Sequence, residues 1–164
     1  MTNFHSFTGT VTRINDFFTG QSTRGCIKLF TVENEMGGIV NFVVSPSTYV
    51  VDQLMVKVGD KITGYYDGDA PAILIYPPQY PALVIVKDII NVNVKVDHFN
   101  RQLVSSDGKL RLNIAPYTRF ELPNGQQFTG NPGNRDLVVI YGPTTFSIPA
   151  QTTPYRVIVL CLGG

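Results

Sequence analysis

The sequence predicts an all-β protein made of two similar units. Nearly every periodic segment alternates apolar and polar residues on a two-residue repeat and is rich in Val, Ile, Thr, Phe and Tyr, as strands are. No stretch keeps a 3.6-residue apolar period, so long helices are not expected. Glycine-containing turns separate the alternating segments, and parts of the first half recur in the second half.

Ten segments of the chain carry this strand pattern. In chain order they are 8–14, 26–32, 39–45, 60–66, 82–90, 92–99, 109–114, 118–122, 136–141 and 155–162. The turns between them lie at 35–38, 67–68, 107–108, 124–125 and 132–133. Turns this short mostly connect antiparallel strands. The segment TYVVDQLMVK (48–57) has little helical character, so a turn or a single helical turn is expected there.

Three stretches of the first half recur in the second half in the same order. SPSTYVV (45–51) matches APYTRFE (115–121), GDKITGYY (59–66) matches RDLVVIYG (135–142), and YPALVIV (80–86) matches TPYRVIV (153–159). The offsets are 70, 76 and 73 residues, which indicates a duplicated unit of about 73 residues. We therefore predict two domains, 1–90 and 91–164. One continuous barrel or sandwich is the alternative.

Each predicted unit has five strands, which suits a small curled barrel of the oligonucleotide/oligosaccharide-binding (OB) type. Gly9 and Gly64 lie in the middle of predicted strands, where a glycine permits a sharp bend or a close approach between backbones. The fold prediction is therefore an all-β chain of two tandem, small OB-like five-stranded barrels related by internal duplication.

Proline-rich segments join the fourth and fifth predicted strands of both units. Residues 70–81 contain four prolines, and GPTTFSIPAQTTPY (142–155) repeats the design in the second unit. Because proline fixes φ and lacks an amide hydrogen, most of 70–81 is expected to stay out of the sheet as a stiff, extended loop. In OB barrels this loop helps to frame the ligand face. The position fits equally well a structural lid that covers a barrel mouth or docks one domain on the other, and this structural interpretation is favoured because AILIY (72–76) is apolar enough to be buried.

The first proline loop and the strand before it carry the candidate ligand face. Its residues are Tyr65, Tyr66, Asp67, Asp69, Tyr76 and Tyr80. Asp67 and Asp69, with Asp60 upstream, offer oxygens to a cation, but a calcium loop needs about six ligands in a short frame. The sequence does not supply them, so we expect the carboxylates to bond local backbone amides, and no metal site is predicted.

Pro77-Pro78-Gln79-Tyr80 matches the PPxY pattern that WW domains bind. The pattern is only four residues long and lies between apolar strands, where we expect it to be inaccessible. Recognition by a WW domain is therefore not the favoured interpretation.

Single-stranded nucleic acid is another possible ligand, because aromatic side chains beside Arg or Lys on a curled sheet can stack bases. Phe42 and Lys61 could extend the tyrosine face in this way. Residues 1–90, however, carry six Lys/Arg against eight Asp/Glu, whereas residues 91–164 carry seven against four. Nucleic acid is therefore disfavoured for the first half. The arginines of the second half, expected on a solvated face, are Arg101, Arg111, Arg119, Arg135 and Arg156.

No catalytic constellation is visible in the sequence. His5 lies in a terminus expected to be mobile, and His98 lies beside Asp97 on a strand, where neighbouring side chains point to opposite faces. The sequence contains no GxSxG, HExxH or paired CxxC motif, so neither an enzyme activity nor a cofactor is predicted. Cys26 and Cys161 are expected to be buried, reduced thiols, with a metal pair or a disulfide as alternatives.

Composition limits the class of protein and its location. Hydrophobic residues make up 43% of the chain and charged residues 15%, which excludes a disordered chain. The longest apolar runs are too short to cross a bilayer, so no membrane association is predicted. The N-terminus MTNFHSFTGT lacks the basic and apolar regions of a secretory signal, which predicts a cytoplasmic protein.

Four longer strings carry a resemblance to a known family. They are VVSPSTYVVD (43–52), VGDKITGYYDGDAPAILIYPPQYPA (58–82), VDHFNRQLVSSDGKLRLNI (96–114) and GPTTFSIPAQTTPYRVIV (142–159). They resemble a family of small bacterial proteins found mainly in anaerobic Gram-positive lineages, and the YYDGDAP/IYPPQY and SIPAQTTP blocks are the most specific. The resemblance covers nearly the whole chain and supports OB-like β-barrel repeats. It implies no activity, ligand or catalytic residue.

Together these observations predict a non-enzymatic binding or scaffold module that acts through the faces framed by the two proline loops. Its partner would be another protein or a further copy of the chain. The alternative is binding of single-stranded nucleic acid or a saccharide through the OB-like faces.

Overall fold

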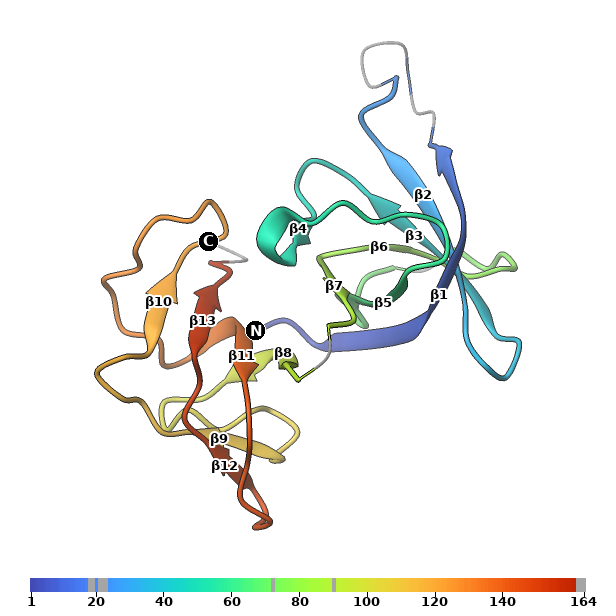
Figure 1. Cartoon of the computed structure of the whole chain (residues 1–164). Coiled ribbons are helices and arrows are strands. Elements are labelled where there is room, and N and C mark those ends of the chain that lie inside the picture. The colour runs from blue at the N-terminus through green and yellow to red at the C-terminus, as the bar shows by residue number, and fades with distance from the viewer. Residues whose placement is uncertain (18–19, 21–23, 72, 90, 162–164) are drawn as a thin grey trace. The chain divides into compact units, whose positions relative to one another are not determined.

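The computed structural model describes residues 1–17, 20, 24–71, 73–89 and 91–161 (Figure 1). Within these ranges the secondary structure is β, apart from one 3-10 turn, η2 (Val51–Gln53). The predictions of an all-β chain and of a single turn near residue 50 are therefore confirmed. The chain forms two compact units: the first unit is His5–Asp88, and the second unit combines Met1–Phe4 with Ile89–Gly164. No helix in the described ranges is long and apolar enough to span a membrane.

The first unit contains a seven-stranded sheet with the order β4-β7-β5-β1-β2-β3-β6. Its strands are β1 (Phe4–Asp16), β2 (Lys28–Glu33), β3 (Ile39–Val44), β4 (Tyr49–Val50), β5 (Lys61–Asp67), β6 (Gln79–Pro81) and β7 (Val84–Lys87). β1, β2 and β3 form an antiparallel meander, and β5 pairs antiparallel with β7. The short strands β4 and β6 lie at the two edges, where they pair parallel with β7 and β3, respectively.

The second unit contains a four-stranded sheet, β10-β13-β11-β8, and a two-stranded sheet, β12-β9. Its strands are β8 (Asn93–Phe99), β9 (Leu110–Leu112), β10 (Arg119–Glu121), β11 (Arg135–Tyr141), β12 (Ala150–Thr152) and β13 (Arg156–Val159). β11 pairs antiparallel with both β8 and β13, whereas β10/β13 and β12/β9 are parallel pairs. None of the sheets formed by the described residues closes into a barrel.

Strand pairing follows the same order in both units. The run β4-β7-β5-β1 in the first unit matches β10-β13-β11-β8 in the second, and the parallel pair β3/β6 matches β9/β12. The turn pattern of the sequence does not predict the parallel pairs. Among the short strands of these pairs, β4, β6 and β12 lie outside the predicted strand segments, whereas β9 and β10 lie within the predicted segments 109–114 and 118–122.

Both proline loops end in a short strand, and among the described residues of 70–81 only Gln79–Pro81 join the sheet, so the expectation that most of this segment stays out of the sheet is met. The Pro78 carbonyl accepts a hydrogen bond from the Asn41 amide (2.8 Å), and the Val43 carbonyl accepts one from the Ala82 amide (2.9 Å). Proline lacks a donor but keeps its acceptor, so the Pro78 carbonyl just before β6 and the Ala82 amide just after it can both bond to β3. The other described residues of the loop lie outside strands, as expected.

Each unit has its own apolar core, and two glycines allow close packing in the first. A Cβ on Gly64 would lie 2.4 Å from the fully buried ring of Phe42, and a Cβ on Gly9 would lie 2.5 Å from the Glu33 carbonyl oxygen. The predicted close approach between backbones is therefore confirmed at Gly9, whereas Gly64 makes room for an aromatic side chain. The core of the second unit consists of Phe99, Leu110, Leu112, Leu137, Val139, Val157 and Val159.

In each unit a threonine hydroxyl links a turn to the residues just before the last strand. The turn precedes β4 in the first unit and β10 in the second. Thr48 Oγ1 donates to the Ala82 carbonyl (2.8 Å) in the first unit. In the second unit Thr118 Oγ1 donates to the Pro154 carbonyl (3.0 Å) and accepts a hydrogen bond from the Ala115 amide (3.2 Å). These two threonines belong to the Pro-x-Thr core that the SPSTYVV and APYTRFE stretches share.

Cys26 and Cys161 are exposed, so the expectation of buried thiols within strands is wrong. Cys26 lies in a turn two residues before β2, and Cys161 lies two residues after β13. Both cysteines therefore lie outside the strands in which they were predicted. The structure holds the two thiols free.

Candidate functional site

An aromatic stack joins β5 to β6 in the first unit. The ring centroids of Tyr66 and Tyr80 lie 3.9 Å apart, with 7° between the ring planes. The Tyr66 centroid also lies 6.2 Å from that of Phe42 and 5.9 Å from that of His5. Burial raises the pKa of Tyr66 to about 12, and the hydrogen bond with Tyr80 contributes to this rise. The rings therefore pack on one another and are not displayed as separate stacking platforms.

The other residues of the predicted ligand face lie elsewhere. Tyr65 alternates with Tyr66 along β5, so the two side chains lie on opposite faces of the sheet. Tyr76 lies in the first proline loop and is exposed. Asp67 Oδ1 accepts a hydrogen bond from the Asp69 amide (2.9 Å), which is the local turn expected from the sequence. The six residues thus belong to a packed ring pair, the opposite face of a strand, a turn and a loop.

Asp60 has local partners in place of a cation. Its carboxylate accepts a hydrogen bond from the Lys57 amide (2.8 Å) and forms an ion pair with Lys87 (3.2 Å). The Lys57 amide and then the Lys87 ammonium lower the pKa of Asp60. In the part of the chain that the structure describes, no three His, Cys, Asp or Glu side chains come together in a way that could hold a metal ion.

Both histidines have defined neighbours. His5 lies in β1 with its ring against Gly68, so the expectation of a mobile terminus at this residue is wrong. His98 Nδ1 lies 2.8 Å from Asp136 Oδ1, and Thr2 Oγ1 donates to the other oxygen of the same carboxylate (2.6 Å). The Asp136 side chain is buried, and its two partners connect the N-terminal residues to β11 and β8. His98 is therefore held as a structural histidine.

The PPxY segment has a structural role at its tyrosine. Gln79 and Tyr80 belong to β6, which pairs with β3, and the Tyr80 ring is occupied by its stack on Tyr66. Pro77 and Pro78 are half-buried. The side chain that would have to enter the groove of a WW domain is therefore packed within the first unit.

The apolar residues of the first proline loop are exposed, which overturns the expectation that they are buried. Leu74 is 100% exposed, Tyr76 78% and Ile73 75%. The Ile75 amide donates to the Ile73 carbonyl (2.9 Å), so the tip is a tight turn. The sequence shows that this segment is apolar. It does not show that a tight turn places the segment outside the sheet, where its side chains face solvent.

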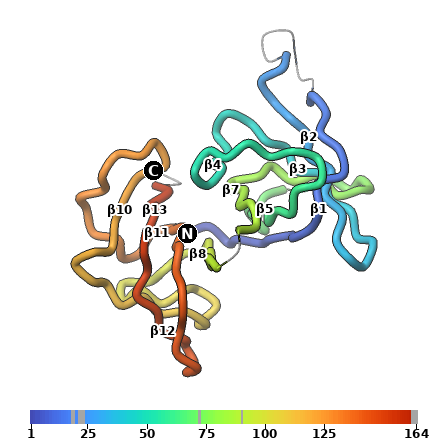
Figure 2. Tube along the Cα trace, viewed as in Figure 1, coloured from blue at the N-terminus to red at the C-terminus, as the bar shows by residue number. Residues whose placement is uncertain are grey.

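The second proline loop has the same character. Phe146 is fully exposed and Ile148 is 93% exposed. The hydroxyls of Thr145 and Ser147 are hydrogen-bonded to each other (2.7 Å), and the Thr145 amide donates to the Gln151 carbonyl (2.9 Å). Figure 2 shows this loop, between β11 and β12, as a narrow orange-red projection. A hydrogen-bonded base therefore presents the two apolar side chains to solvent.

The charges beside the two loops are opposite in sign. Asp67 and Asp69 precede the tip of the first loop. Lys109 and Arg111 are exposed residues at β9, the strand that pairs with β12 at the end of the second loop. The Ala150 amide donates to the Lys109 carbonyl (2.9 Å), which fixes this basic segment against the loop. Each apolar tip is therefore accompanied by its own charge.

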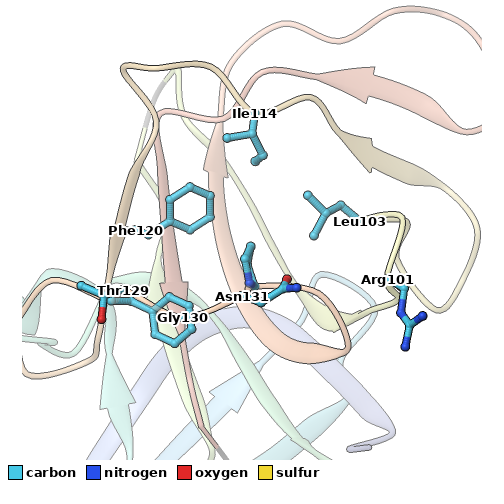
Figure 3. Close-up of a pocket in the computed structure, with 9 residues that line it drawn as sticks. Arg101, Leu103, Ile114, Phe120, Thr129, Gly130 and Asn131 are labelled. Carbon is cyan, nitrogen blue, oxygen red and sulfur yellow. The ribbon is translucent and has the colours of Figure 1, made fainter.

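Two pockets on the second unit share Phe120 and Phe128, and we refer to them together as the Phe120/Phe128 site. The first pocket has a volume of about 380 Å³. In Figure 3 the side chains of Leu103, Ile114 and Phe120 converge on it, and Arg101 lies at its edge. The pocket therefore has an apolar floor and a basic rim.

The second pocket, of about 430 Å³, continues along β10 and is more polar. Its lining includes Tyr117, which is exposed, together with Arg119 and Glu121. Glu121 forms ion pairs with Arg156 (2.6 Å) and Arg119 (3.5 Å). Its negative charge is therefore balanced by two guanidinium groups.

A further arginine, Arg135, holds the Phe128 ring, one of the two rings that the pockets share. The Arg135 guanidinium lies 5.0 Å from the centroid of the Phe128 ring, a cation–π distance. Arg135 Nε donates to the Asn131 carbonyl (2.7 Å), so the guanidinium is itself held in place. A Cβ on Gly130 would lie 2.8 Å from the Phe128 ring, which means that this ring covers the glycine closely.

Comparison with protein-family models, with curated proteins and with solved structures gives no match to this chain. The resemblance to a bacterial family therefore stays a prediction. What the protein does has to be inferred from its geometry and chemistry.

Sequence reasoning missed Phe120 and Phe128 as site residues. One signal could have found them: the offset between the matched stretches rises from 70 to 76 residues between 121 and 135. The second unit therefore has about six more residues in this segment than the first, and Phe128 lies within it. Loops that lengthen on a common scaffold are frequent places for binding residues.

Proposed function

We propose that this protein is a non-enzymatic scaffold module that associates with further copies of itself through the apolar tips of its two proline loops. The observation that carries the proposal is the complete exposure of Leu74 and Phe146, each on a loop whose end is paired into a sheet. Contiguous apolar groups of this kind commonly mark interaction surfaces. The exposed apolar residues beside them are Ile73, Ile75, Tyr76 and Ile148.

We infer that the two loops arose by internal duplication of a small OB-like unit. The shared order of strand pairing and the equivalent hydroxyl bonds of Thr48 and Thr118 support this origin. A duplicated unit supplies two binding elements of similar shape on one chain. Two such elements are what a scaffold needs, because each copy can then contact two neighbours.

The charges beside the tips favour contact between unlike loops. Asp67 and Asp69 accompany the first tip, whereas Lys109 and Arg111 accompany the second. Like tips would bring like charges together, which opposes their association. The first loop of one copy therefore binds the second loop of the next. This is a head-to-tail contact, which builds chains of molecules unless the geometry closes a ring.

The expected association is weak. Burial of one Leu, Ile or Phe side chain contributes about 1.5–3 kcal/mol. Association costs about 4–15 kcal/mol in lost translational and rotational freedom, so a contact between a few side chains from each tip leaves a small net free energy. Dimers and longer chains should therefore form at protein concentrations of roughly 10–500 µM.

Light scattering after size exclusion tests the proposal. The weight-average mass of the wild-type chain should rise above 18.1 kDa as concentration increases. The variant L74S/F146S should keep the monomer mass at every concentration. A wild-type chain that stays monomeric to about 500 µM would contradict the proposal. The proposal would also be contradicted if the wild-type chain bound phosphatidylcholine vesicles and L74S/F146S did not, because the tips would then be lipid anchors.

A further inference from the structure

The Phe120/Phe128 site has the dimensions of a binding site for an extended ligand. Its two pockets, of about 380 and 430 Å³, fall in the lower part of the range of small-ligand sites, about 300–1,000 Å³. Because the pockets share two side chains, one ligand chain can pass from the first to the second. This arrangement suits successive units of a polymer better than one compact molecule.

The Phe128 ring, which lines both pockets, is held in a way that suits stacking. Arg135 lies over one face of Phe128, Gly130 lies against the tip of this ring, and both phenylalanine rings are partly buried against the core of the second unit. A ring held in this way loses little conformational freedom when a flat group stacks on it. Tyr117, which is exposed in the second pocket, adds another aromatic surface. Successive aromatic side chains along a groove are the usual platform for unpaired bases.

The charge of the site selects an anionic polymer. Arg101 lines the first pocket, Arg119 lines the second, and Arg135 lies at the ring between them. Among the described residues that line the two pockets, Glu121 supplies the only carboxylate, and Arg156 holds it at 2.6 Å. Arg119 and Arg156 share the single charge of Glu121, so positive charge exceeds negative charge at the site, and phosphates match this excess better than a neutral saccharide does.

We propose that the Phe120/Phe128 site binds single-stranded nucleic acid, with bases against the two phenylalanine rings and backbone phosphates beside Arg101 and Arg119. The structure thus brings together three of the arginines that the sequence places on different segments of the second half. This inference is independent of self-association, because it uses none of the residues at the loop tips.

Fluorescence anisotropy of labelled dT12 and U12 oligonucleotides, titrated with the full chain at 20 mM and 200 mM NaCl, tests the inference. Affinity should fall with salt, and Phe128→Leu should weaken binding about 5- to 100-fold. Arg119→Gln should reduce the slope of log K against log salt by about 0.7. Because Arg119 is a surface residue, this variant tests the site even where Phe128→Leu fails to fold. The matched control is Arg13→Gln, which removes one exposed arginine from the first unit.

Three results would overturn the inference. The first is the absence of an anisotropy change at 20 mM NaCl with about 100 µM protein, a concentration that detects even weak non-specific binding. The second is oligonucleotide binding that Phe128→Leu and Arg119→Gln leave unchanged or that Arg13→Gln weakens equally. The third is calorimetric binding of a neutral oligosaccharide such as chitohexaose that depends on Phe128 and not on salt. Repeating the titrations in the L74S/F146S chain separates this outcome from the outcome for self-association.

Discussion

The ring of Tyr66 in β5 stacks on the ring of Tyr80 in β6 at 3.9 Å, although β1, β2 and β3 lie between these strands in the sheet order. The contact requires the sheet to curl until its edge strand approaches β5. The link between β6 and β7 follows this curl, because the Ala82 amide bonds to β3 and the Leu83 amide bonds to the Tyr65 carbonyl in β5 (2.8 Å). The stack therefore stabilises the curvature of the first unit.

Stability at alkaline pH should depend on Tyr66. Its pKa is raised from 10.0 to about 12, so folding disfavours the phenolate. The stabilisation that the neutral Tyr66 hydroxyl contributes is therefore complete below pH 10 and is lost as the pH rises from 10 towards 12. Tyr66→Phe keeps the ring and should flatten the dependence of the unfolding free energy on pH in this window. Urea unfolding at several pH values measures this, with Tyr117→Phe at an exposed ring as the control. An unchanged slope in Tyr66→Phe would show that the stack is not coupled to folding.

Gly64→Ala should destabilise the first unit. The new Cβ would lie 2.4 Å from the Phe42 ring, which is fully buried and cannot withdraw. Overpacking of this kind costs about 1–3 kcal/mol. Phe42→Leu shortens the obstructing side chain, so the double variant should be more stable than the sum of the two single effects predicts. Thermal or urea unfolding of the four chains measures this coupling, and strict additivity would contradict the contact.

Thr118→Val should cost about 1–3 kcal/mol of unfolding free energy, because it removes both hydrogen bonds of a buried hydroxyl. Thr118→Ser keeps the hydroxyl and should retain most of the stability. Thr48→Val, at a half-buried position, should have a smaller effect of the same sign. Equal stability of the Val and Ser variants at residue 118 would show that the hydroxyl contributes nothing.

Acid stability should depend on Asp107. Burial by itself raises the pKa of its carboxyl, but hydrogen bonds from Lys95, Ser105 and the Lys109 amide outweigh this effect and hold the pKa at about 2. The contribution is therefore present above pH 3.8 and is lost as the pH falls from 3.8 towards 2. Asp107→Asn should lower the unfolding free energy at neutral pH and flatten its fall in this range. The Asp107 side chain is partly exposed, so the effect should be modest and should shrink in salt. The prediction would be contradicted if the unfolding free energy of Asp107→Asn fell with pH in parallel with that of the wild type.

The sequence predicts the class of fold because the longer strands are periodic or rich in Val and Ile. Segments 39–45 and 136–141 are rich in Val and Ile and correspond to β3 and β11; burial alternates over Ile39–Phe42 of β3, whereas Asp136–Ile140 of β11 is buried throughout. The short strands β4, β6 and β12 were not predicted, whereas β9 and β10, which are also short, lie within the predicted segments 109–114 and 118–122. Their parallel pairing depends on where a segment distant in the sequence joins the sheet. Turn signals between neighbouring strands do not encode this position.

The candidate site is less predictable than the strands. Tyr65 and Tyr66 are adjacent in sequence and lie on opposite faces of β5, so an aromatic-rich string does not form one surface. The exposure of Leu74 depends on the tight turn at its loop tip, and an apolar composition suggests the reverse. The Phe120/Phe128 site joins β10 to a loop, and no local pattern marks that contact.

Mixing two single variants tests the proposed scaffold most directly. Leu74→Ser leaves only the second tip intact, and Phe146→Ser leaves only the first. In sedimentation velocity each variant alone should remain at 18.1 kDa, while the equimolar mixture should form a dimer and nothing larger. Restored dimers would establish contact between unlike loops of two copies. A mixture that stays monomeric while the wild type associates, or single variants that dimerise alone, would contradict this account.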